Sequence, residues 1–199
     1  MKYRGELFLE GKLLKQLSQS ISAPRLEHSL GTRDLAVKLG NRYGLDKERV
    51  AMAALLHDCA RELGNDRLTE FALQEGLVVG EAEKEMPVFL HGPVGAVIAR
   101  KEYGVTDLKV LRAITLHTTG AQKMGLLDKV LFVADKVEPG RKYSGVEGLR
   151  ELAFNNLDRC LLFCLDRSVR HSLEKGVILH PEICEARNGV LRDTIESRV

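Results

Sequence analysis

The sequence predicts an all-α protein. Apolar residues recur at spacings of three and four along most of the chain, and no segment alternates apolar and polar residues as a half-buried strand does. Residues that cap or break helices separate these segments at short intervals. The 199 residues are 44% hydrophobic and 29% charged, which is typical of a globular protein with enough chain for one core. We therefore expect a single domain over residues 1–199.

Capping signals divide the first half of the chain. Ser22 with Pro24 can begin a helix, and Asp46 can cap the next one. Pro93 can open another helix, and Thr106 can cap the helix after it. Glycines near the ends of several apolar stretches provide stops. These signals predict helices over residues 23–43, 47–58, 65–75, 93–103 and 107–117.

The second half has one strongly apolar helix, expected over 126–137 and expected to be buried. Helices near 146–156 and 157–175 should follow, the second ended by Gly176, and a last helix should start at Pro181. The loop at 139–148 is the one candidate boundary between domains. Residues 161–165, LLFCL, are too apolar to stand apart, so we expect helices 146–199 to pack on the rest.

Charge and hydropathy exclude some classes of function. The formal net charge of +2 gives no indication of a long nucleic acid partner. No apolar run approaches the ~20 residues that span a membrane, and MKYRGELFLEGKLLKQ at the N-terminus lacks the apolar core of a signal peptide. We expect a cytoplasmic protein.

The four cysteines form no C-x-x-C pair. Cys160 and Cys164 share one helix face because they are four residues apart. These two cysteines can be small buried side chains, or they can be metal ligands, and the sequence leaves both interpretations open.

Polar side chains gather at or near the ends of the predicted helices. They are His28, His57, Asp58, His91, His117 and Asp135. Imidazoles and carboxylates are ligands for divalent metals in hydrolases. A cation would also offset the free-energy cost of gathering such groups in an apolar helical core. The pattern therefore predicts a metal centre built from several helix ends.

Each residue of this set also has an ordinary interpretation. A single histidine can be a satisfied core residue, and Asp58 can cap the turn that follows it. Asp135 can pair with Lys136 or Arg141 in a structural salt bridge. His180 precedes a helix N-terminus that can face a ligand.

In this order, H…HD…H…H…D, the set resembles the HD-domain metal-dependent phosphohydrolases. The blocks EHSLGTRDLA, ALLHDCAREL, LHGPVGA, LHTTG, ADKVEPGR and LHPEICEARN, from residue 27 to 188, are similar to the YqeK-like family of bacterial symmetrical bis(5'-nucleosyl)-tetraphosphatases. The resemblance implies an all-helical HD core over about 24–138 with helices 146–199 packed on it. It also implies cleavage of diadenosine tetraphosphate into two ADP molecules and a homodimer.

The resemblance implies a role for each matching residue. Metal ligands fall on His28, His57, Asp58 and Asp135, and His91 and His117 hold either a second metal or the substrate phosphates. The ion is expected to be iron, with manganese, cobalt and zinc as alternatives, in one or two copies. Further substrate contacts fall on Arg61, Arg141 and the stretch 177–182, which includes Ile178, His180 and Pro181. The family usually has a tyrosine-alanine-lysine run at this position, whereas this sequence has Cys59, Ala60 and Arg61.

These residues suggest a mechanism. A bound metal lowers the pKa of its water toward ~7 and polarises the phosphoryl oxygen, and Asp58 is the natural carboxylate to bridge two ions. Arg61 and Arg141 would stabilise charge on the phosphates. His91 or His117, where not a ligand, can protonate the leaving oxygen, and Thr118 can bind phosphate or simply end its helix. Hydrolysis of a different nucleotide, such as a deoxynucleotide or guanosine alarmone, and a non-catalytic nucleotide sensor are the alternatives.

Overall fold

The computed structural model describes residues 2–196, and within this range every regular element is helical. The all-α prediction is therefore confirmed. The elements are α1 (Lys2–Ser20), α2 (Ala23–Arg42), α3 (Lys47–Leu56), α4 (Asn65–Gln74), α5 (Glu81–Glu85), the 3-10 helix η1 (Pro87–Leu90), α6 (His91–Lys101), α7 (Leu108–Leu116), α8 (Leu126–Val137), α9 (Val146–Asn155), α10 (Leu157–Lys175) and α11 (Pro181–Glu196).

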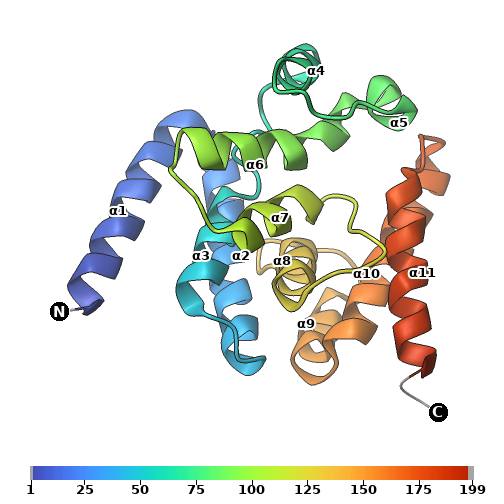
Figure 1. Ribbon diagram of the computed structural model, residues 1–199. Coiled ribbons are helices and arrows are strands. Elements are labelled where there is room, and N and C mark those ends of the chain that lie inside the picture. The colour runs from blue at the N-terminus through green and yellow to red at the C-terminus, as the bar shows by residue number, and fades with distance from the viewer. Residues whose placement is uncertain (1, 197–199) are drawn as a thin grey trace.

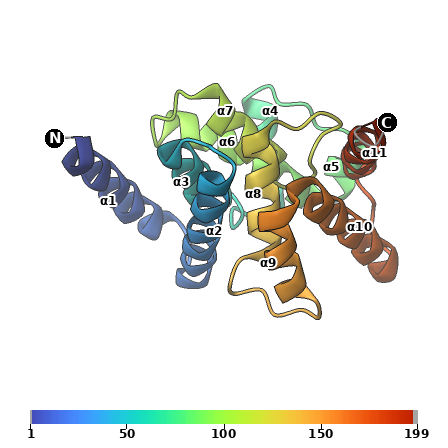
Figure 2. The ribbon, with the colours of Figure 1, turned by 90° about the horizontal axis from the view of Figure 1, so that it is seen from below.

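Helix α8 lies at the centre of the fold (Figures 1 and 2). It contacts α2, α3 and α7 on one side and α9 and α10 on the other. Phe132, Val133 and Ala134 are completely buried, as the apolar sequence predicts for this helix. The helices that follow the loop after α8 share its core, because Leu161 and Leu165 of α10 are also completely buried. Helix α1 lies at one edge of the molecule and α11 at the opposite edge.

Side-chain caps fix where several helices begin. Ser22 accepts a hydrogen bond from the backbone N–H of Arg25 at the start of α2, and Asp46 accepts one from Arg49 at the start of α3. Each such cap stabilises a helix by about 1 kcal/mol. Gly176 ends α10 in the left-handed conformation, with φ of 62°. These starts and stops were predicted from the sequence and are confirmed.

Two predicted boundaries were wrong. Asp107, not Thr106, caps α7, because the Asp107 carboxylate accepts a hydrogen bond from the backbone N–H of Lys109. Helix α6 begins at His91 rather than at Pro93. Proline is tolerated at its third position because the N–H groups of a first helical turn have no partner within the helix.

Helices α1, α5 and η1 were not predicted. Helix α5 has the sequence EAEKE and buries none of its residues, so it carries no apolar periodicity. Among residues 2–196, no helix combines the length and the apolar character needed to cross a lipid bilayer.

Candidate metal centre

The structure brings together all six residues of the helix-end set. His28 lies in the first half of α2, while His57 and Asp58 follow α3 directly. His91 is the first residue of α6, His117 follows α7, and Asp135 lies in the last turn of α8. Five helices thus each place one or two of these residues at one point. His28 is partly buried, and the other five are at most 5% exposed.

Asp58 lies between two groups of ligands. Its Oδ2 atom is 3.5 Å from Nε2 of His57 and 3.7 Å from Nε2 of His28. Its Oδ1 atom is 3.3 Å from Nε2 of His91 and 3.4 Å from Nε2 of His117. Each carboxylate oxygen therefore faces a separate pair of imidazoles.

Asp135 completes the first group. Its Oδ1 atom is 3.0 Å from Nε2 of His28 and 3.7 Å from Nε2 of His57. Two sets of donor atoms are close enough together to hold a metal ion, namely His28, His57 and Asp58, and Asp58, His91 and His117. Asp58 belongs to both sets, so its carboxylate would contribute to both if each set held an ion.

The position of three histidines at helix ends determines which ring nitrogen faces the centre. Nδ1 of His57, His91 and His117 each donates to the backbone carbonyl three residues earlier, at 2.7 Å for His57 and His117. Carbonyls near a helix end often lack an N–H partner, and the Val88 carbonyl, which already accepts the backbone N–H of His91, has a second lone pair for this bond. Because a carbonyl only accepts, Nδ1 carries the proton and Nε2 presents a lone pair to Asp58.

These lone pairs face one another. Nε2 of His28 is 3.2 Å from Nε2 of His57, and Nε2 of His91 is 3.0 Å from Nε2 of His117. Two lone pairs at this distance repel unless a positive charge lies between them. Adjacent ligands of an ion bound at ~2.1 Å lie ~3.0 to ~3.4 Å apart, depending on the coordination geometry. The chemistry and spacing of the donor set therefore fit divalent cations.

Charge interactions keep the two carboxylates ionised. Burial alone raises the pKa of Asp58, but the positive charge that the surrounding imidazoles carry when protonated, His57 first, holds that pKa well below its usual range. Burial acts in the same direction on Asp135, and the ammonium group of Lys136 holds the pKa of Asp135 well below its usual range. Burial lowers the pKa of His117 to about 4, so this imidazole is neutral near pH 7 and suited to bind a cation.

Comparison with known proteins identifies the family to which this chain belongs. The HD domain family model matches residues 25–140. The chain is 32% identical to the symmetrical bis(5'-nucleosyl)-tetraphosphatase of Halalkalibacterium halodurans, over 91% of this chain and 96% of that one. It is 33% identical to the protein of the same name from Staphylococcus aureus, over 89% of this chain and 92% of that one. The chain belongs to the HD domain family, in the branch of these tetraphosphatases.

A solved structure agrees with this family. The chain resembles a crystal structure described as a predicted HD superfamily hydrolase involved in NAD metabolism, from Clostridium acetobutylicum. The TM-score is 0.90 at 37% identity, over 92% of this chain and 97% of that one. HD domains are metal-dependent, in agreement with the donor set described above.

Two arginines contact the carboxylates of this HD centre. Nη1 of Arg25 is 2.7 Å from Oδ2 of Asp58, and Nη2 of Arg141 is 3.0 Å from Oδ1 of Asp135. Arg141 was predicted as a phosphate contact, and the structure also contains the alternative salt bridge to Asp135. Arg25 was not predicted. The sequence did hold an indication of its role, because Arg25 lies three residues before His28 and both therefore share one face of α2.

The other predicted contacts differ in their surroundings. The hydroxyl of Thr118 is 3.1 Å from Nε2 of His91, so Thr118 adjoins the centre. Arg61 is partly exposed; its backbone N–H donates to the carbonyl of Asp58 at 3.0 Å, but its side chain has no hydrogen bond or ion pair with the described part of the chain. The structure therefore places Thr118 at the centre and gives the side chain of Arg61 no internal role.

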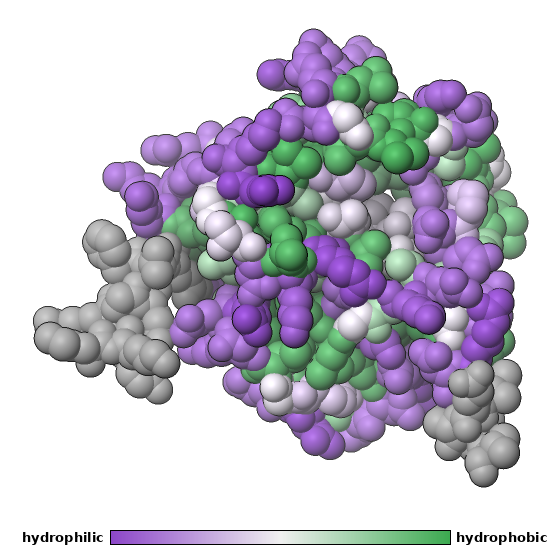
Figure 3. All heavy atoms as spheres, viewed as in Figure 1, coloured by the Kyte–Doolittle hydropathy of each residue, from purple (hydrophilic) through white to green (hydrophobic). Residues whose placement is uncertain are grey.

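A cavity of about 180 Å³ adjoins the centre. It is lined by Glu83, Phe89, Pro93, Thr115, Leu116, Thr119, Gly120, His180 and Glu182. Pro93 lies two residues after His91, and Thr119 lies two residues after His117, so the segments that carry two histidines of the second group also line this cavity. Residues of intermediate hydropathy, pale in Figure 3, surround a hollow between α6 and α11 on this face.

His180 forms one wall of this cavity. Its Nδ1 accepts from the backbone N–H of Glu182, so Nε2 carries the proton and donates to Oε1 of Glu83 at 2.9 Å. The ring of Phe89 packs edge-on against the imidazole at 4.8 Å. Of the other predicted residues in this segment, Ile178 is half-buried and Pro181 is exposed, and neither lines the cavity.

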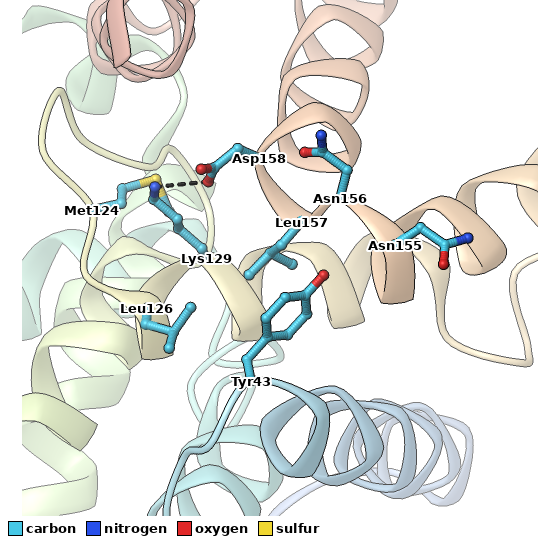
Figure 4. A pocket seen from close by; sticks show the side chains of 8 residues that line it. All are labelled: Tyr43, Met124, Leu126, Lys129, Asn155, Asn156, Leu157 and Asp158. Atoms are coloured by element: carbon cyan, nitrogen blue, oxygen red, sulfur yellow. Dashed lines mark hydrogen bonds and ion pairs between the residues drawn. The ribbon is translucent and has the colours of Figure 1, made fainter. Parts of the chain in front are cut away.

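A larger cavity of about 370 Å³ lies away from the centre (Figure 4). Leu126 of α8 lines it, and Asp135 lies nine residues further along the same helix, about 14 Å away. Lys129 and Asp158 in its wall are already paired with each other at 2.7 Å. This cavity therefore brings no unpaired charge to the chemistry at Asp58.

Proposed function

We propose that this protein hydrolyses diadenosine tetraphosphate symmetrically to two ADP molecules, with divalent cations bound around Asp58. The observation that carries the proposal is the pair of ligand groups on the two oxygens of Asp58. Such a pair suits the hydrolysis of a phosphoanhydride, because two adjacent cations can neutralise a polyphosphate from both sides of the scissile bond. The names of the relatives, symmetrical bis(5'-nucleosyl)-tetraphosphatases, support a dinucleoside tetraphosphate as the substrate.

In this proposal, each ligand group holds one ion. His28, His57, Asp58 and Asp135 would hold the first, and Asp58, His91 and His117 the second. Iron is proposed as the native metal, with manganese, cobalt and zinc as substitutes, because all accept imidazole and carboxylate ligands. When bound, these ions supply charge neutralisation and an activated water.

The arginines would bind the phosphates. Arg25 and Arg141 keep 28% and 39% of their side-chain surface exposed while they contact Asp58 and Asp135. Once those carboxylates bind cations, each guanidinium can turn its paired N–H donors to a phosphate oxygen. Arg61, whose side chain has no internal partner, would contact the polyphosphate further from the centre, and the hydroxyl of Thr118 would donate to an oxygen near His91.

The cavity beside the second ligand group would hold one nucleoside. Phe89 and Leu116 give it apolar surface for a base, while the carboxylates of Glu83 and Glu182 favour base N–H donors over phosphate. His180 would contact this nucleoside, and Ile178 and Pro181 would flank it on the same segment. With the base held here, the distance to Asp58 would decide which anhydride is cleaved.

The test combines metal analysis with product analysis. The protein is purified without a chelator, its bound metal is measured, and diadenosine tetraphosphate turnover is followed by chromatography. ADP as the only product is expected. AMP with ATP would contradict symmetrical cleavage, and no turnover with bound metal would favour another nucleotide or a sensor. In Asp58→Ala, which removes the carboxylate shared by both groups, hydrolysis should fall at least about 1,000-fold while the fold is retained.

A further inference from the structure

Glu138 is a buried carboxylate directly beside the first ligand group. It is 4% exposed and follows the end of α8, three residues after Asp135. Its Oε1 atom is 3.1 Å from Nδ1 of His28, from which it is separated by 110 residues in the sequence. A carboxylate only accepts hydrogen bonds, so Nδ1 of His28 carries the proton.

His28 needs an external acceptor because of its place in α2. The other three histidines donate Nδ1 to a carbonyl of their own segment, near a helix end. His28 lies inside α2, where each carbonyl accepts the N–H four residues later. Glu138 supplies the acceptor that the helix interior does not offer.

Two glycines make room for the Glu138 carboxylate. A Cβ atom on Gly31, one turn after His28, would lie 2.8 Å from Oε2 of Glu138, and one on Gly140 would lie 2.9 Å from it. The backbone N–H of Gly140 donates to the same Oε2 atom. Arg150 donates to the carbonyl of Glu138 at 2.8 Å and to that of Arg141 at 2.9 Å, which fixes the loop. The chain therefore forms a specific socket for this carboxylate.

We propose that Glu138 is a positioning residue for the metal centre, which keeps His28 protonated at Nδ1 and directs its Nε2 atom toward Asp58 and Asp135. The inference rests on the proposed metal centre and is independent of the substrate. A carboxylate bonded to the outer nitrogen of a ligand histidine fixes its tautomer and makes it a stronger ligand. Loss of such a partner weakens metal binding by about 10- to 100-fold.

The variant Glu138→Gln tests the role of the charge and the tautomer. Gly140 needs an acceptor at one end of the new amide, which turns the NH₂ group toward Nδ1 of His28. His28 would then favour the tautomer with its proton on Nε2, and this proton must leave Nε2 before a metal ion can bind there. Glu62→Gln is the matched control, because Glu62 accepts hydrogen bonds from Ser22 at the start of the same helix without contact to His28.

Two measurements decide the inference. Metal-free protein is titrated with Mn²⁺. In Glu138→Gln the affinity for one of the two ions should fall about 10- to 100-fold, while Glu62→Gln should bind both ions as the wild type does. Nitrogen NMR of the metal-free proteins should show His28 protonated at Nδ1 in the wild type and at Nε2 in Glu138→Gln.

Unchanged metal affinity or an unchanged His28 tautomer in folded Glu138→Gln would overturn the inference. Should Glu138→Gln fail to fold, Glu138→Asp retains the charge with a shorter reach, and it is expected to show the same loss of one ion. Wild-type protein that binds no ion would overturn the metal centre as well. A lack of turnover with two ions bound would overturn only the substrate.

Discussion

The Nε2 atoms of His91 and His117 face each other at 3.0 Å, and Oδ1 of Asp58 lies within 3.4 Å of both. The Nδ1 atoms of both rings donate to backbone carbonyls, so neither histidine can relieve this contact by a simple shift of its proton to Nε2. The contact is therefore a source of repulsion in the metal-free protein and of affinity for a cation. The Nε2 atoms of His28 and His57 face each other in a similar way, at 3.2 Å, on the other oxygen of Asp58.

Metal binding should therefore raise the thermal stability of the protein. An ion present at 100 times its Kd adds about 2.7 kcal/mol to the free energy of unfolding. For a chain of this length that corresponds to a rise in Tm of roughly 5–10 °C. Thermal melts of chelator-treated protein with and without Mn²⁺ measure this rise. In Asp58→Ala the rise should disappear, and an equal rise in both proteins would place the bound ion elsewhere.

The two ligand groups predict that the ions can be lost separately. His117→Gln removes a ligand from the second group only, so bound metal should fall from two ions per chain to one. His28→Gln should remove the ion of the first group and likewise leave one ion per chain. Elemental analysis of protein purified without chelator measures both. His171→Gln, an exposed substitution on α10, is the control. If either variant lost both ions, or if the wild type bound only one, two independent sites would be excluded.

The corrected cap of α7 makes a prediction about stability. Asp107→Ala removes the acceptor of the Lys109 N–H and should lower the free energy of unfolding by about 1 kcal/mol, or Tm by roughly 2–4 °C. The exposed ion pair of Asp107 with Arg49 adds little to this value. Thr106→Ala should leave Tm nearly unchanged. Urea unfolding of both variants compares the two residues, and equal losses would show that the cap is not specific to Asp107.

Local signals in the sequence predicted most of the fold. Ser22 and Asp46 are strong caps, and the apolar run from 126 to 137 matches α8 at both ends. Thr106 and Asp107 are adjacent residues that both favour caps, so sequence alone did not distinguish them. Helix α5 has no buried face, and nothing in its charged sequence separates it from a loop.

Proximity in the centre was predicted for residues that lie at helix ends or interrupt an apolar helix. His57 and Asp58 met the first condition, and Asp135 met the second. Glu138 and Arg25 also lie at helix ends, but this position alone did not separate them from other charged residues at helix ends. Their partners are distant in the sequence, 110 residues away for Glu138 and 33 for Arg25, and each lies in a segment where a charged side chain is ordinarily exposed to solvent. The packing of α2 against α3 brings Arg25 to Asp58, and the packing of α2 against α8 brings Glu138 to His28.

Arg25 and Arg61 should affect catalysis in different ways. Arg25 touches Asp58 and would stabilise charge that develops at the reacting phosphate, so Arg25→Ala should lower kcat about 100-fold with metal content unchanged. Arg61 would contact the substrate further from the centre, so Arg61→Ala should raise KM and leave kcat nearly unchanged. Arg100→Ala, an exposed substitution at the far end of α6, is the control. Steady-state kinetics on metal-loaded protein separates these effects. An unchanged kcat in Arg25→Ala would show that its contact with Asp58 is only structural, while a loss of bound metal would mean that Arg25 acts by organising the ligands.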